Sequence, residues 1–328
     1  MYKEHCNSLE NGRKKRNTVI AVLLAAGLIL TACASHNSVS DSTESSIKKP
    51  LTENDVTTWD CIWFGNYWQN TDSNGDGIVT QDDDKEPIKW RVLDIDADGN
   101  ALLISDQLLD IIDINPEEKE MTWENSILRS FLNSYDASFN VYEMDYSSSG
   151  FLNNAFSEEE INAITVSSVK NEDNPVFGTE GGNDAEDKLF CLSITEAISP
   201  EYGFVSNEFT EPAEGKKKIF TAKDPTRNAV TTSYADNKEG FTSKEMERSF
   251  APYWTRTSGL DLTYPGHISG NGGAYCASVH MDEYRMNIRP VFRMNLSDSS
   301  SLWSYAGTVS SDGTVNENTG LEGEGAEN

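Results

Sequence analysis

Oxygen-bearing side chains recur at alternate positions between residues 72 and 83, in the segment DSNGDGIVTQDD. A calcium loop of about twelve residues supplies oxygen ligands from positions one, three, five, seven, nine and twelve. Gly77 stands at position six, where such a loop turns sharply. The segment therefore predicts a structural Ca²⁺ site, whose ligands are Asp72, Asn74, Asp76, the carbonyl of Ile78, Thr80 and Asp83.

The residues on either side of this loop indicate what kind of calcium site it is. FGNYWQN, which precedes the loop, has strand character, and Pro87 follows it closely. Proline lacks a backbone N–H and restricts the residue before it, so no exiting helix is expected. A calcium sensor needs a helix pair to open, and a dockerin carries two such loops. The sequence predicts a calcium clamp on a hairpin, and a solvated acidic turn is the alternative.

Three arginines lie in aromatic or apolar segments of a chain that is poor in basic residues: Arg129, Arg256 and Arg289. Trp254, Arg256 and Arg289 are the candidate ligand-binding residues, for a carboxylate or a sugar. The alternative is structural, with the arginines paired to carboxylates or stacked on rings inside the domain. The triplets that sugar-binding C-type lectins use for calcium-dependent binding are absent from the sequence.

The sequence offers little for the common catalytic chemistries. It has neither His-x-x-x-His nor Gly-x-Ser-x-Gly, so catalytic zinc and a serine-hydrolase elbow are not expected. Pairs of carboxylates occur, but in a chain this acidic they are more often solvated surface. Cys61, Cys191 and Cys276 form no Cys-x-x-Cys motif, and both one disulfide and three buried thiols remain open. Binding is therefore expected rather than catalysis.

The chain carries 26 basic and 54 acidic residues among 328, a net charge of −28. This charge excludes a general attraction to nucleic acid or to anionic lipid headgroups. A content of 37% hydrophobic residues is enough to build a buried core.

The N-terminus predicts a lipoprotein signal peptide over residues 1–32. A positive segment, residues 13–16, precedes the apolar run TVIAVLLAAGLIL. Leu30-Thr31-Ala32-Cys33 then resembles the bacterial lipobox, in which the cysteine thiol is lipidated. Acyl chains on Cys33, palmitate among them, would hold the protein to the outer face of a bacterial membrane. An uncleaved anchor helix is the alternative.

The body of the chain is expected to form one domain over residues 55–309. A Ser/Thr-rich tether, residues 33–54, precedes it, and an acidic tail, residues 310–328, follows. Residues 88–105 predict a hairpin that turns at Asp98-Gly99, and residues 121–135 predict a helix capped by Thr122. Capping boxes are expected at Ser157–Glu160 and Ser193–Glu196. Further strands are predicted over residues 61–68, 252–259, 273–281, 287–296 and 301–309.

An ordered series of motifs resembles an uncharacterised family of secreted bacterial domains common in gut Firmicutes. Its members show Phe-Gly-x-Tyr, Trp-x-Val-Leu, a Trp-Trp-Leu-Arg-Ser-like element and a closing Val-Arg-Pro. The matching segments are FGNYWQ, PIKWRVL, LLISDQLLD, TWENSILRSFLN, AFSEEEINAI, DKLFCLSITEA, YWTRTSG and NIRPVFRMNL. The resemblance spans about Trp59 to Leu296.

That family in turn is similar to the sulfatase-modifying-factor branch of the C-type-lectin-like fold. The similarity implies an α+β class and a single loop-rich, C-type-lectin-like domain. With the catalytic motifs absent, the sequence predicts a module that binds a carbohydrate or a protein at the cell surface, and the net charge excludes nucleic acid as a partner. An enzyme of the sulfatase-modifying type, or a degenerate one, is the alternative. The copper-binding cysteine pair of such enzymes is missing, since only Cys276 lies near the C-terminal end of the domain.

Overall fold

Two long strands form on either side of the predicted calcium loop. β2 (Val56–Tyr67) and β3 (Glu86–Ile95) pair antiparallel, with Cys61 opposite Arg91. The structure, a computed structural model, describes residues 47–209, 221–238, 250–277 and 285–318. The chain divides into two units, Met1–Ser45 and Ser46–Asn328, and all of the described residues belong to the second.

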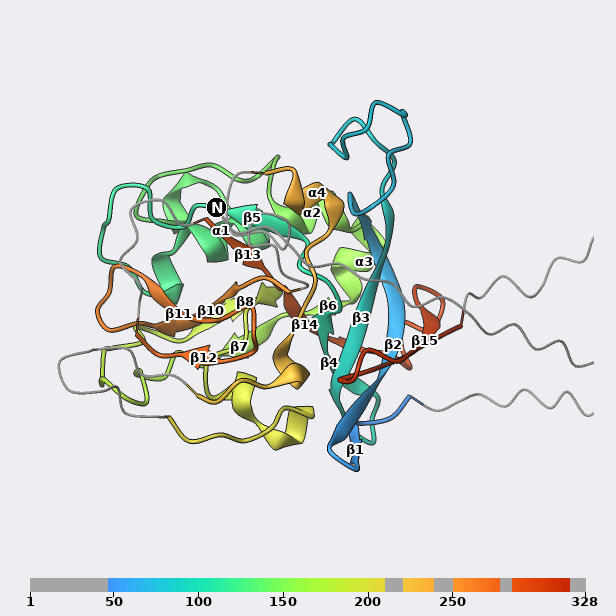
Figure 1. Ribbon diagram of the computed structural model, residues 1–328. Coiled ribbons are helices and arrows are strands. Elements are labelled where there is room, and N and C mark those ends of the chain that lie inside the picture. The colour runs from blue at the N-terminus through green and yellow to red at the C-terminus, as the bar shows by residue number, and fades with distance from the viewer. Residues whose placement is uncertain (1–46, 210–220, 239–249, 278–284, 319–328) are drawn as a thin grey trace, which may run out of the picture. The chain divides into compact units, whose positions relative to one another are not determined.

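The largest sheet has nine strands in these described ranges. Their order is β16-β15-β2-β3-β4-β14-β6, with β1 beside β2 and β9 beside β14 (Figure 1). The other strands are β1 (Leu51–Glu53), β4 (Asn100–Ser105), β6 (Ile164–Thr165), β9 (Leu189–Phe190), β14 (Val291–Asn295), β15 (Ser304–Ser310) and β16 (Val315–Glu317). The first and last long strands, β2 and β15, are therefore direct neighbours.

Within the described ranges, a second sheet has five strands, in the order β12-β11-β10-β13-β5, and β7 and β8 form a separate pair. Figure 1 shows β13 leading into β14, so one stretch of chain passes from the smaller sheet to the larger. The strands are β5 (Asp110–Ile112), β7 (Ser167–Val169), β8 (Ala185–Asp187), β10 (Tyr253–Ser258), β11 (Pro265–Ile268), β12 (Ala274–Tyr275) and β13 (Met286–Ile288).

The helices are short, and the longest in the described ranges has seven residues. They are α1 (Ile127–Asn133), α2 (Phe151–Ala155), α3 (Glu158–Ala163) and α4 (Ser233–Asp236). The 3₁₀ turns are η1 (Trp123–Asn125), η2 (Ala137–Phe139), η3 (Glu196–Ile198), η4 (Pro200–Tyr202) and η5 (Pro225–Arg227). Within the described residues, no helix has the length and apolar character to cross a membrane.

The predicted fold class, an α+β C-type-lectin-like domain, is wrong. The structure is mostly β-sheet, with 31% strand and 15% helix arranged around several sheets. The helical spacing of residues 121–135 arises from two short pieces, η1 and α1, rather than one helix. Ser126 separates them, and its side chain caps α1 by accepting from the Arg129 N–H at 3.1 Å. Ser134 ends α1 in the left-handed region.

Several predicted elements are confirmed. β3 and β4 form the expected hairpin, in which the Asp96 carboxylate accepts N–H bonds from Asp98 and Asn100. The capping boxes at Ser157–Glu160 and Ser193–Glu196 are both present as reciprocal hydrogen bonds.

The last strands differ in detail from the expectation. Residues 287–296 divide into β13 and β14 at Arg289-Pro290. Of the strand predicted over residues 273–281, Ala274–Tyr275 is formed, and residues 278–281 lie outside the described residues.

One apolar cluster extends through both sheets and the helices. Trp90 is completely buried in it; its indole N–H donates to the Phe64 carbonyl at 2.7 Å, and its ring meets Phe292 edge-on at 4.7 Å. The ordered domain also extends past its predicted limits, because β1 falls within the predicted tether and β16 within the predicted tail. Both strands add to the large sheet.

Candidate functional site

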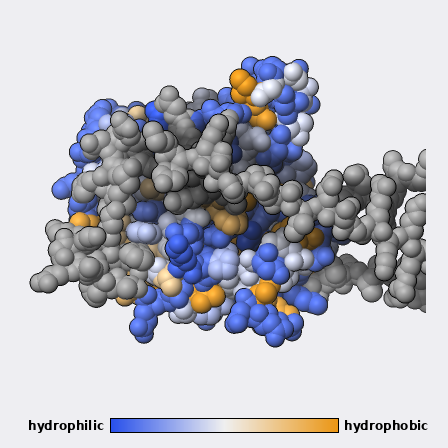
Figure 2. Space-filling model, viewed as in Figure 1, coloured by the Kyte–Doolittle hydropathy of each residue, from blue (hydrophilic) through white to orange (hydrophobic). Residues whose placement is uncertain are grey.

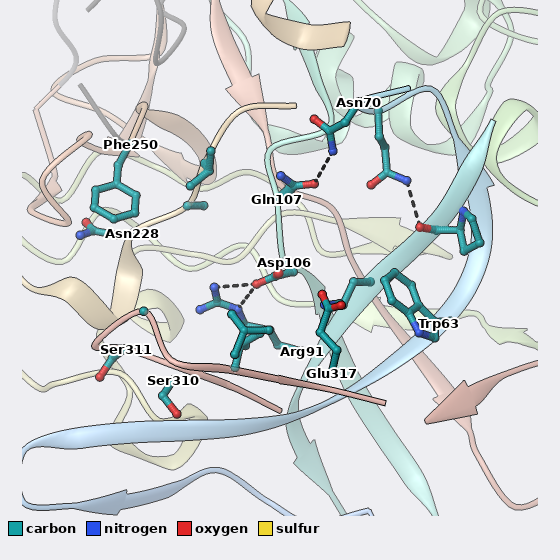
Figure 3. A pocket seen from close by; sticks show the side chains of 18 of the residues that line it. Trp63, Asn70, Arg91, Asp106, Gln107, Asn228, Phe250, Ser310, Ser311 and Glu317 are labelled. Carbon is teal, nitrogen blue, oxygen red and sulfur yellow. Dashed lines mark hydrogen bonds and ion pairs between the residues drawn. The ribbon is translucent and has the colours of Figure 1, made fainter. Parts of the chain in front are cut away.

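A cleft of about 490 Å³ lies against one face of β2 and β3. Its lining comes from these strands, from the residues after β4, from residues 225–230 and from the β15–β16 hairpin. Figure 3 shows Trp63 and Phe250 at opposite sides of the cleft, with polar side chains between them.

Strand alternation places the charged side chains of the cleft. In β3, Ile88, Trp90 and Val92 are buried, whereas Lys89 and Arg91 are partly exposed on the other face. Asp106 follows β4, and its backbone N–H donates to the Lys89 carbonyl at 2.9 Å, which holds it beside β3.

Arg91 and Asp106 form an ion pair in the cleft (Figure 3). Nε and Nη2 of Arg91 lie 2.7 and 2.6 Å from the same oxygen, Oδ1 of Asp106. The guanidinium also stacks over Trp59, at 5.1 Å from the ring centre. Among the described residues, Oδ2 of Asp106 has no such partner, so it is available to accept a hydrogen bond from a ligand.

Other polar groups of the cleft are held by internal contacts. Lys89 Nζ lies 3.2 Å from Glu317 and 4.8 Å from the ring centre of Trp63. The Asn70 amide donates to Gln107 at 3.1 Å. These contacts fix donors and acceptors in place before any ligand arrives, which lowers the entropy cost of binding.

Arg289, one of the predicted ligand residues, lies behind the cleft wall with 1% of its surface exposed. Its Nε donates to the Ser105 carbonyl at 3.0 Å, and Nη1 donates to the Tyr253 hydroxyl at 3.1 Å and the Arg227 carbonyl at 3.3 Å. Its Nη2 has no hydrogen-bond partner among the residues that the structure describes. Burial is the main cause that lowers the pKa of Arg289, and no carboxylate forms an ion pair with it in the described part of the chain.

Arg256 and Trp254, the other predicted ligand residues, are buried on β10. Arg256 donates through Nη1 and Nη2 to both carboxylate oxygens of Glu196, and through Nη1 to the Cys191 carbonyl at 2.8 Å. Trp254 stacks on Tyr264 at 6.5 Å. The structure therefore does not gather Trp254, Arg256 and Arg289 into an open site, and the internal pairing of Arg256 matches the structural alternative.

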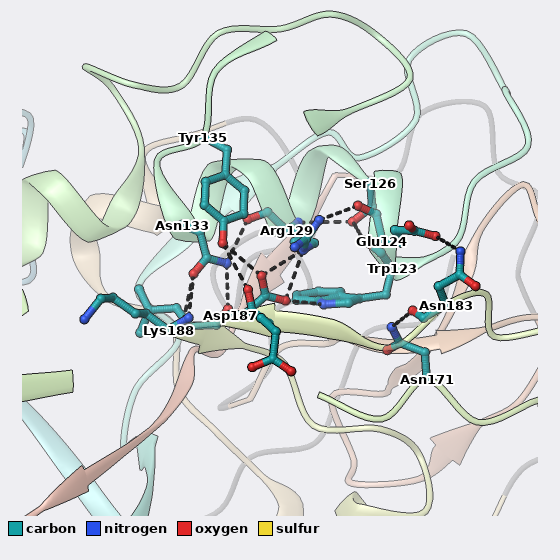
Figure 4. Close-up of polar contacts among 12 residues, drawn as sticks. Trp123, Glu124, Ser126, Arg129, Asn133, Tyr135, Asn171, Asn183, Asp187 and Lys188 are labelled. Atoms are coloured by element: carbon teal, nitrogen blue, oxygen red, sulfur yellow. Dashed lines mark hydrogen bonds and ion pairs between the residues drawn. The ribbon is translucent and has the colours of Figure 1, made fainter. Parts of the chain in front are cut away.

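Arg129 has an internal partner as well (Figure 4). Its Nε donates to both oxygens of Asp187, and the Trp123 indole N–H donates to the same carboxylate at 2.9 Å. The Tyr135 hydroxyl donates to Oδ1 of Asp187 at 3.1 Å, and its ring lies 5.1 Å from the guanidinium. The TWENSILRSFLN and DKLFCLS motifs thus meet at one buried ion pair.

The predicted calcium loop joins β2 to β3 and projects beyond them (Figure 1). The Asp72 carboxylate accepts N–H bonds from Gly75, Asp76 and Gly77 at 2.7 to 3.2 Å. Gly77 has φ +90°, the left-handed backbone that the sharp turn requires.

The second half of the loop is closed by Asp83. Its carboxylate accepts from the Ser73, Asn74 and Thr80 N–H groups, and these bonds lower its pKa, with the Thr80 bond the largest cause. Within the described residues, no three His, Cys, Asp or Glu side chains converge as a metal-holding group. The loop is therefore shaped by its own hydrogen bonds, and calcium binding stays a prediction.

The three cysteines of the domain, Cys61, Cys191 and Cys276, are free and buried. Burial raises the pKa of each thiol to about 12. Of the two possibilities left open by the sequence, the structure shows three buried thiols. Cys33, the predicted lipidation site, lies outside the described residues.

Sequence reasoning missed the cleft residues Trp63, Arg91, Asp106 and Asn228. The one local signal was the alternation in PIKWRVL, which puts Lys89 and Arg91 on the face opposite Trp90. The other lining residues come together through pairing between distant segments, which one sequence does not reveal.

Comparison with known proteins identifies the family but no function. No curated protein and no solved structure matches the chain. The expected similarity to sulfatase-modifying factors and C-type lectins has no support from these comparisons. A family model described as a domain of unknown function, DUF6273, matches residues 98–296, which include Asp106, Asn228 and Arg289. The chain belongs to the DUF6273 domain family.

Proposed function

We propose that this protein is a lipid-anchored cell-surface binder that holds a carbohydrate in the cleft over β2 and β3, to which the region matched by DUF6273 contributes Asp106 and Asn228. The observation that best supports this proposal is the Arg91–Asp106 pair. It holds guanidinium donors beside an available carboxylate oxygen, in a cleft that aromatic side chains also line. A sugar offers adjacent hydroxyls that donate and accept hydrogen bonds, and so complements such a pair.

The rest of the lining supports a polar ligand of several sugar units. Gln69, Asn70, Gln107 and Asn228 supply planar amide groups, and Trp63 and Phe250 supply aromatic surface. A cleft of about 490 Å³ with few, fixed polar groups is typical of a small-molecule site. On the face drawn in Figure 2, the described surface is mostly hydrophilic, and apolar side chains occur in small separate groups.

A glycan array probed with the soluble domain, residues 34–328, tests this function. Asp106→Ala removes the acceptor oxygen and the partner of Arg91, so we expect at least about a tenfold loss of affinity for any glycan that the wild type binds. Asp94→Ala is the matched control, because Asp94 is likewise an aspartate in an ion pair, but it lies on β3 and pairs with Lys49 outside the cleft. An array without hits, or equal losses in the two variants, would overturn the proposal.

Membrane attachment through Cys33 is the second part of this proposal. It is supported by the basic segment, the apolar run and the Leu-Thr-Ala-Cys sequence that precede the folded domain. The test is metabolic labelling of a bacterial host with tagged palmitate. We expect label on the wild type and none on Cys33→Ala, with Cys6→Ala as the matched control that keeps the label. Label that persists on Cys33→Ala would refute the anchor.

A structural calcium ion in the loop of residues 72–83 is the third part. Its carboxylate, amide, carbonyl and hydroxyl oxygens are the hard ligands that Ca²⁺ prefers, and the loop already turns at Gly77 as such a site requires. Asn70 and Glu86, which flank the loop, both line the cleft, and Oε2 of Glu86 accepts from the Thr71 N–H at 2.8 Å. An ion in the loop would therefore stabilise one rim of the binding site.

A further inference from the structure

Asp110, the first residue of β5, is a buried carboxylate outside the cleft. Its exposed fraction is 2%, and Nζ of Lys238 contacts its Oδ1. The described residues contain four further ion pairs between a lysine and a carboxylate, in which the carboxylate side chains are 33% to 66% exposed. Among the lysine pairs of the described chain, Lys238–Asp110 is therefore the one whose carboxylate is buried.

The backbone fixes both partners of this pair. Asp110 lies in a strand that pairs with β13. The Lys238 N–H donates to the Ala235 carbonyl at 3.0 Å, which ties the lysine to the end of α4. The Thr232 N–H, at the start of α4, donates to the Leu108 carbonyl at 3.0 Å and so holds α4 beside β5 (Figure 1). The amine and the carboxyl group are therefore held in contact from two segments 128 positions apart in the sequence.

Aromatic side chains surround the pair. The Tyr67 hydroxyl donates to Oδ2 of Asp110 at 2.7 Å, and Nζ of Lys238 lies 4.3 Å from the ring centre of Tyr234. The Tyr67 ring meets Tyr234 edge-on at 5.7 Å and lies 4.7 Å from Phe151. Burial raises the pKa of Tyr67 well above its usual range, and the charge of Asp110 adds to this rise, so the hydroxyl keeps its proton. The carboxyl group thus has an amine at one oxygen and a neutral donor at the other.

Burial makes the ionic form of this pair costly. Two charges taken out of water lose solvation that their mutual attraction only partly restores. Burial lowers the pKa of Lys238 and the charge of Asp110 raises it, with a rise as the result, so the pair starts as ammonium and carboxylate. An amide in the same place carries no charge. Groups held in contact react at effective concentrations of about 10⁵ M or more, so condensation is favoured here far more than between free groups in water.

We infer that Lys238 and Asp110 condense to an intramolecular isopeptide bond. A proton passes from Nζ to Oδ1, and the lone pair left on Nζ attacks Cγ. The Tyr67 hydroxyl stabilises the negative charge that develops on Oδ2. The Cγ–Oδ1 bond then breaks, and Oδ1 leaves as water with a second proton from Nζ. An amide between Nζ and Cγ remains.

This reaction needs no oxidant, reductant or other co-reactant, because one ammonium group and one carboxylate give one amide and one water molecule. The Lys238 side chain keeps 35% of its surface exposed, so the water can reach the solvent. The bond does not depend on what the cleft binds.

Intact mass spectrometry of the soluble domain, residues 34–328, tests this bond. We expect the wild type to be lighter than its sequence by one water molecule, and peptide mapping to find Lys238 and Asp110 in one linked fragment. Lys238→Arg keeps the positive charge but cannot form the amide, so it should have the full sequence mass. Lys170→Arg is the matched control, since Lys170 pairs with the exposed Asp184 and the deficit should stay unchanged.

Two outcomes would overturn the isopeptide bond. The first is a folded wild type with the full sequence mass, which would leave Lys238–Asp110 as an ion pair. The second is a deficit that persists in Lys238→Arg, because a succinimide at an aspartate also loses one water molecule. The linked fragment is sought in the wild type itself, so the test stays decisive even where Lys238→Arg fails to fold.

Tyr67→Phe tests the role of the hydroxyl. The variant keeps the aromatic ring and removes the donor to Oδ2, so the mass deficit should appear about a hundredfold more slowly. Mass spectrometry at intervals after cell-free synthesis measures this rate, and tryptophan fluorescence reports the fold. Tyr135→Phe is the matched control, because it removes the hydroxyl bond to another buried carboxylate, Asp187, and should keep the wild-type rate. The wild-type rate in folded Tyr67→Phe would contradict the role assigned to Tyr67.

Discussion

Arg129 holds Asp187 by a forked contact, with Nε at 2.8 and 3.0 Å from the two carboxylate oxygens, and the Asp187 side chain is completely buried. Asp187 belongs to the separate strand pair β7–β8, whereas Arg129 lies in α1. One ion pair therefore connects a helix to a small sheet through a residue that lies 58 positions later in the sequence.

Breaking this pair should cost the domain much of its stability. Asp187→Ala leaves the Arg129 guanidinium buried without its anion, and such changes cost about 3–5 kcal/mol. We expect this loss in the free energy of unfolding, measured by urea titration of the tryptophan fluorescence. Asp184→Ala is the control, since its partner Lys170 is exposed and such pairs contribute about 0–1 kcal/mol. Similar losses in the free energy of unfolding of the two variants would show that the buried pair contributes no more stability than the exposed pair.

Removal of calcium should destabilise the domain through its loop. We expect a chelator to lower the melting temperature of the wild type, and Asp72→Ala to abolish this response. Asp96→Ala is a matched control. Asp96 also accepts N–H bonds within a tight turn, at 2.9 Å from Asp98 and Asn100, but lies outside the loop. It should lower the melting temperature while the response to chelator persists. A wild type that is indifferent to chelator would contradict the calcium proposal.

The buried thiols should make the domain sensitive to alkaline pH. Burial raises the pKa of Cys61 and Cys191 from 9.0 to about 12, so the folded state keeps them neutral after the unfolded chain has ionised. Their contribution to stability is complete below pH 9 and is lost as the pH rises from 9 towards 12. Each thiol should account for a loss of about 1 kcal/mol between pH 9 and pH 10.

Urea titrations of the wild type and of Cys191→Ala across this pH range measure that loss. The variant should show a smaller loss than the wild type, because it has one fewer buried thiol. The same burial predicts that iodoacetamide labels Cys61, Cys191 and Cys276 only after denaturation. Rapid labelling in the native protein, or identical pH slopes, would refute this account.

Arg256 should matter for folding and not for recognition. Both of its terminal nitrogens bind Glu196, and it is buried on β10. Arg256→Ala should therefore reduce the free energy of unfolding by several kcal/mol, about 3–5 if the site behaves as a buried pair. The fraction that stays folded should bind a glycan with wild-type affinity, as measured by calorimetry with the active fraction determined. A loss of glycan affinity without a loss in the free energy of unfolding would show that Arg256 contributes to ligand binding.

Local sequence patterns correctly predicted the elements that depend on residues close together in the sequence. The hairpin of β3 and β4 follows from strand alternation and the turn at Asp98-Gly99, and the Ser157–Glu160 capping box follows from its spacing. The helix predicted over residues 121–135 was wrong because Ser126 caps a new helix within the apolar pattern. At this point a side-chain hydrogen bond of Ser126, rather than helix propensity, determines where the helix begins.

Local sequence patterns could not predict the candidate site, because its residues come from segments far apart in the sequence. Arg91 meets Asp106 because β3 and β4 pair, but Asn228 and Ser311 reach the same cleft only through contacts between distant segments. Arg129, Arg256 and Arg289 attracted attention in the sequence because basic residues are rare in this acidic chain. In the structure, Arg129 and Arg256 form ion pairs with carboxylates inside the domain. Arg129 and Arg256 therefore stabilise the fold and do not line the cleft.

The pairing of β2 with β15 sets the order in which the molecule can be completed. The Thr57 N–H donates to the Ser311 hydroxyl across 254 positions of the sequence, and closing so long a loop is slow. The edge of β2 therefore stays open during synthesis until almost the whole domain has emerged. A protease cut between β14 and β15, followed by release of the C-terminal fragment, would open that edge to pairing with other chains and would remove one wall of the cleft.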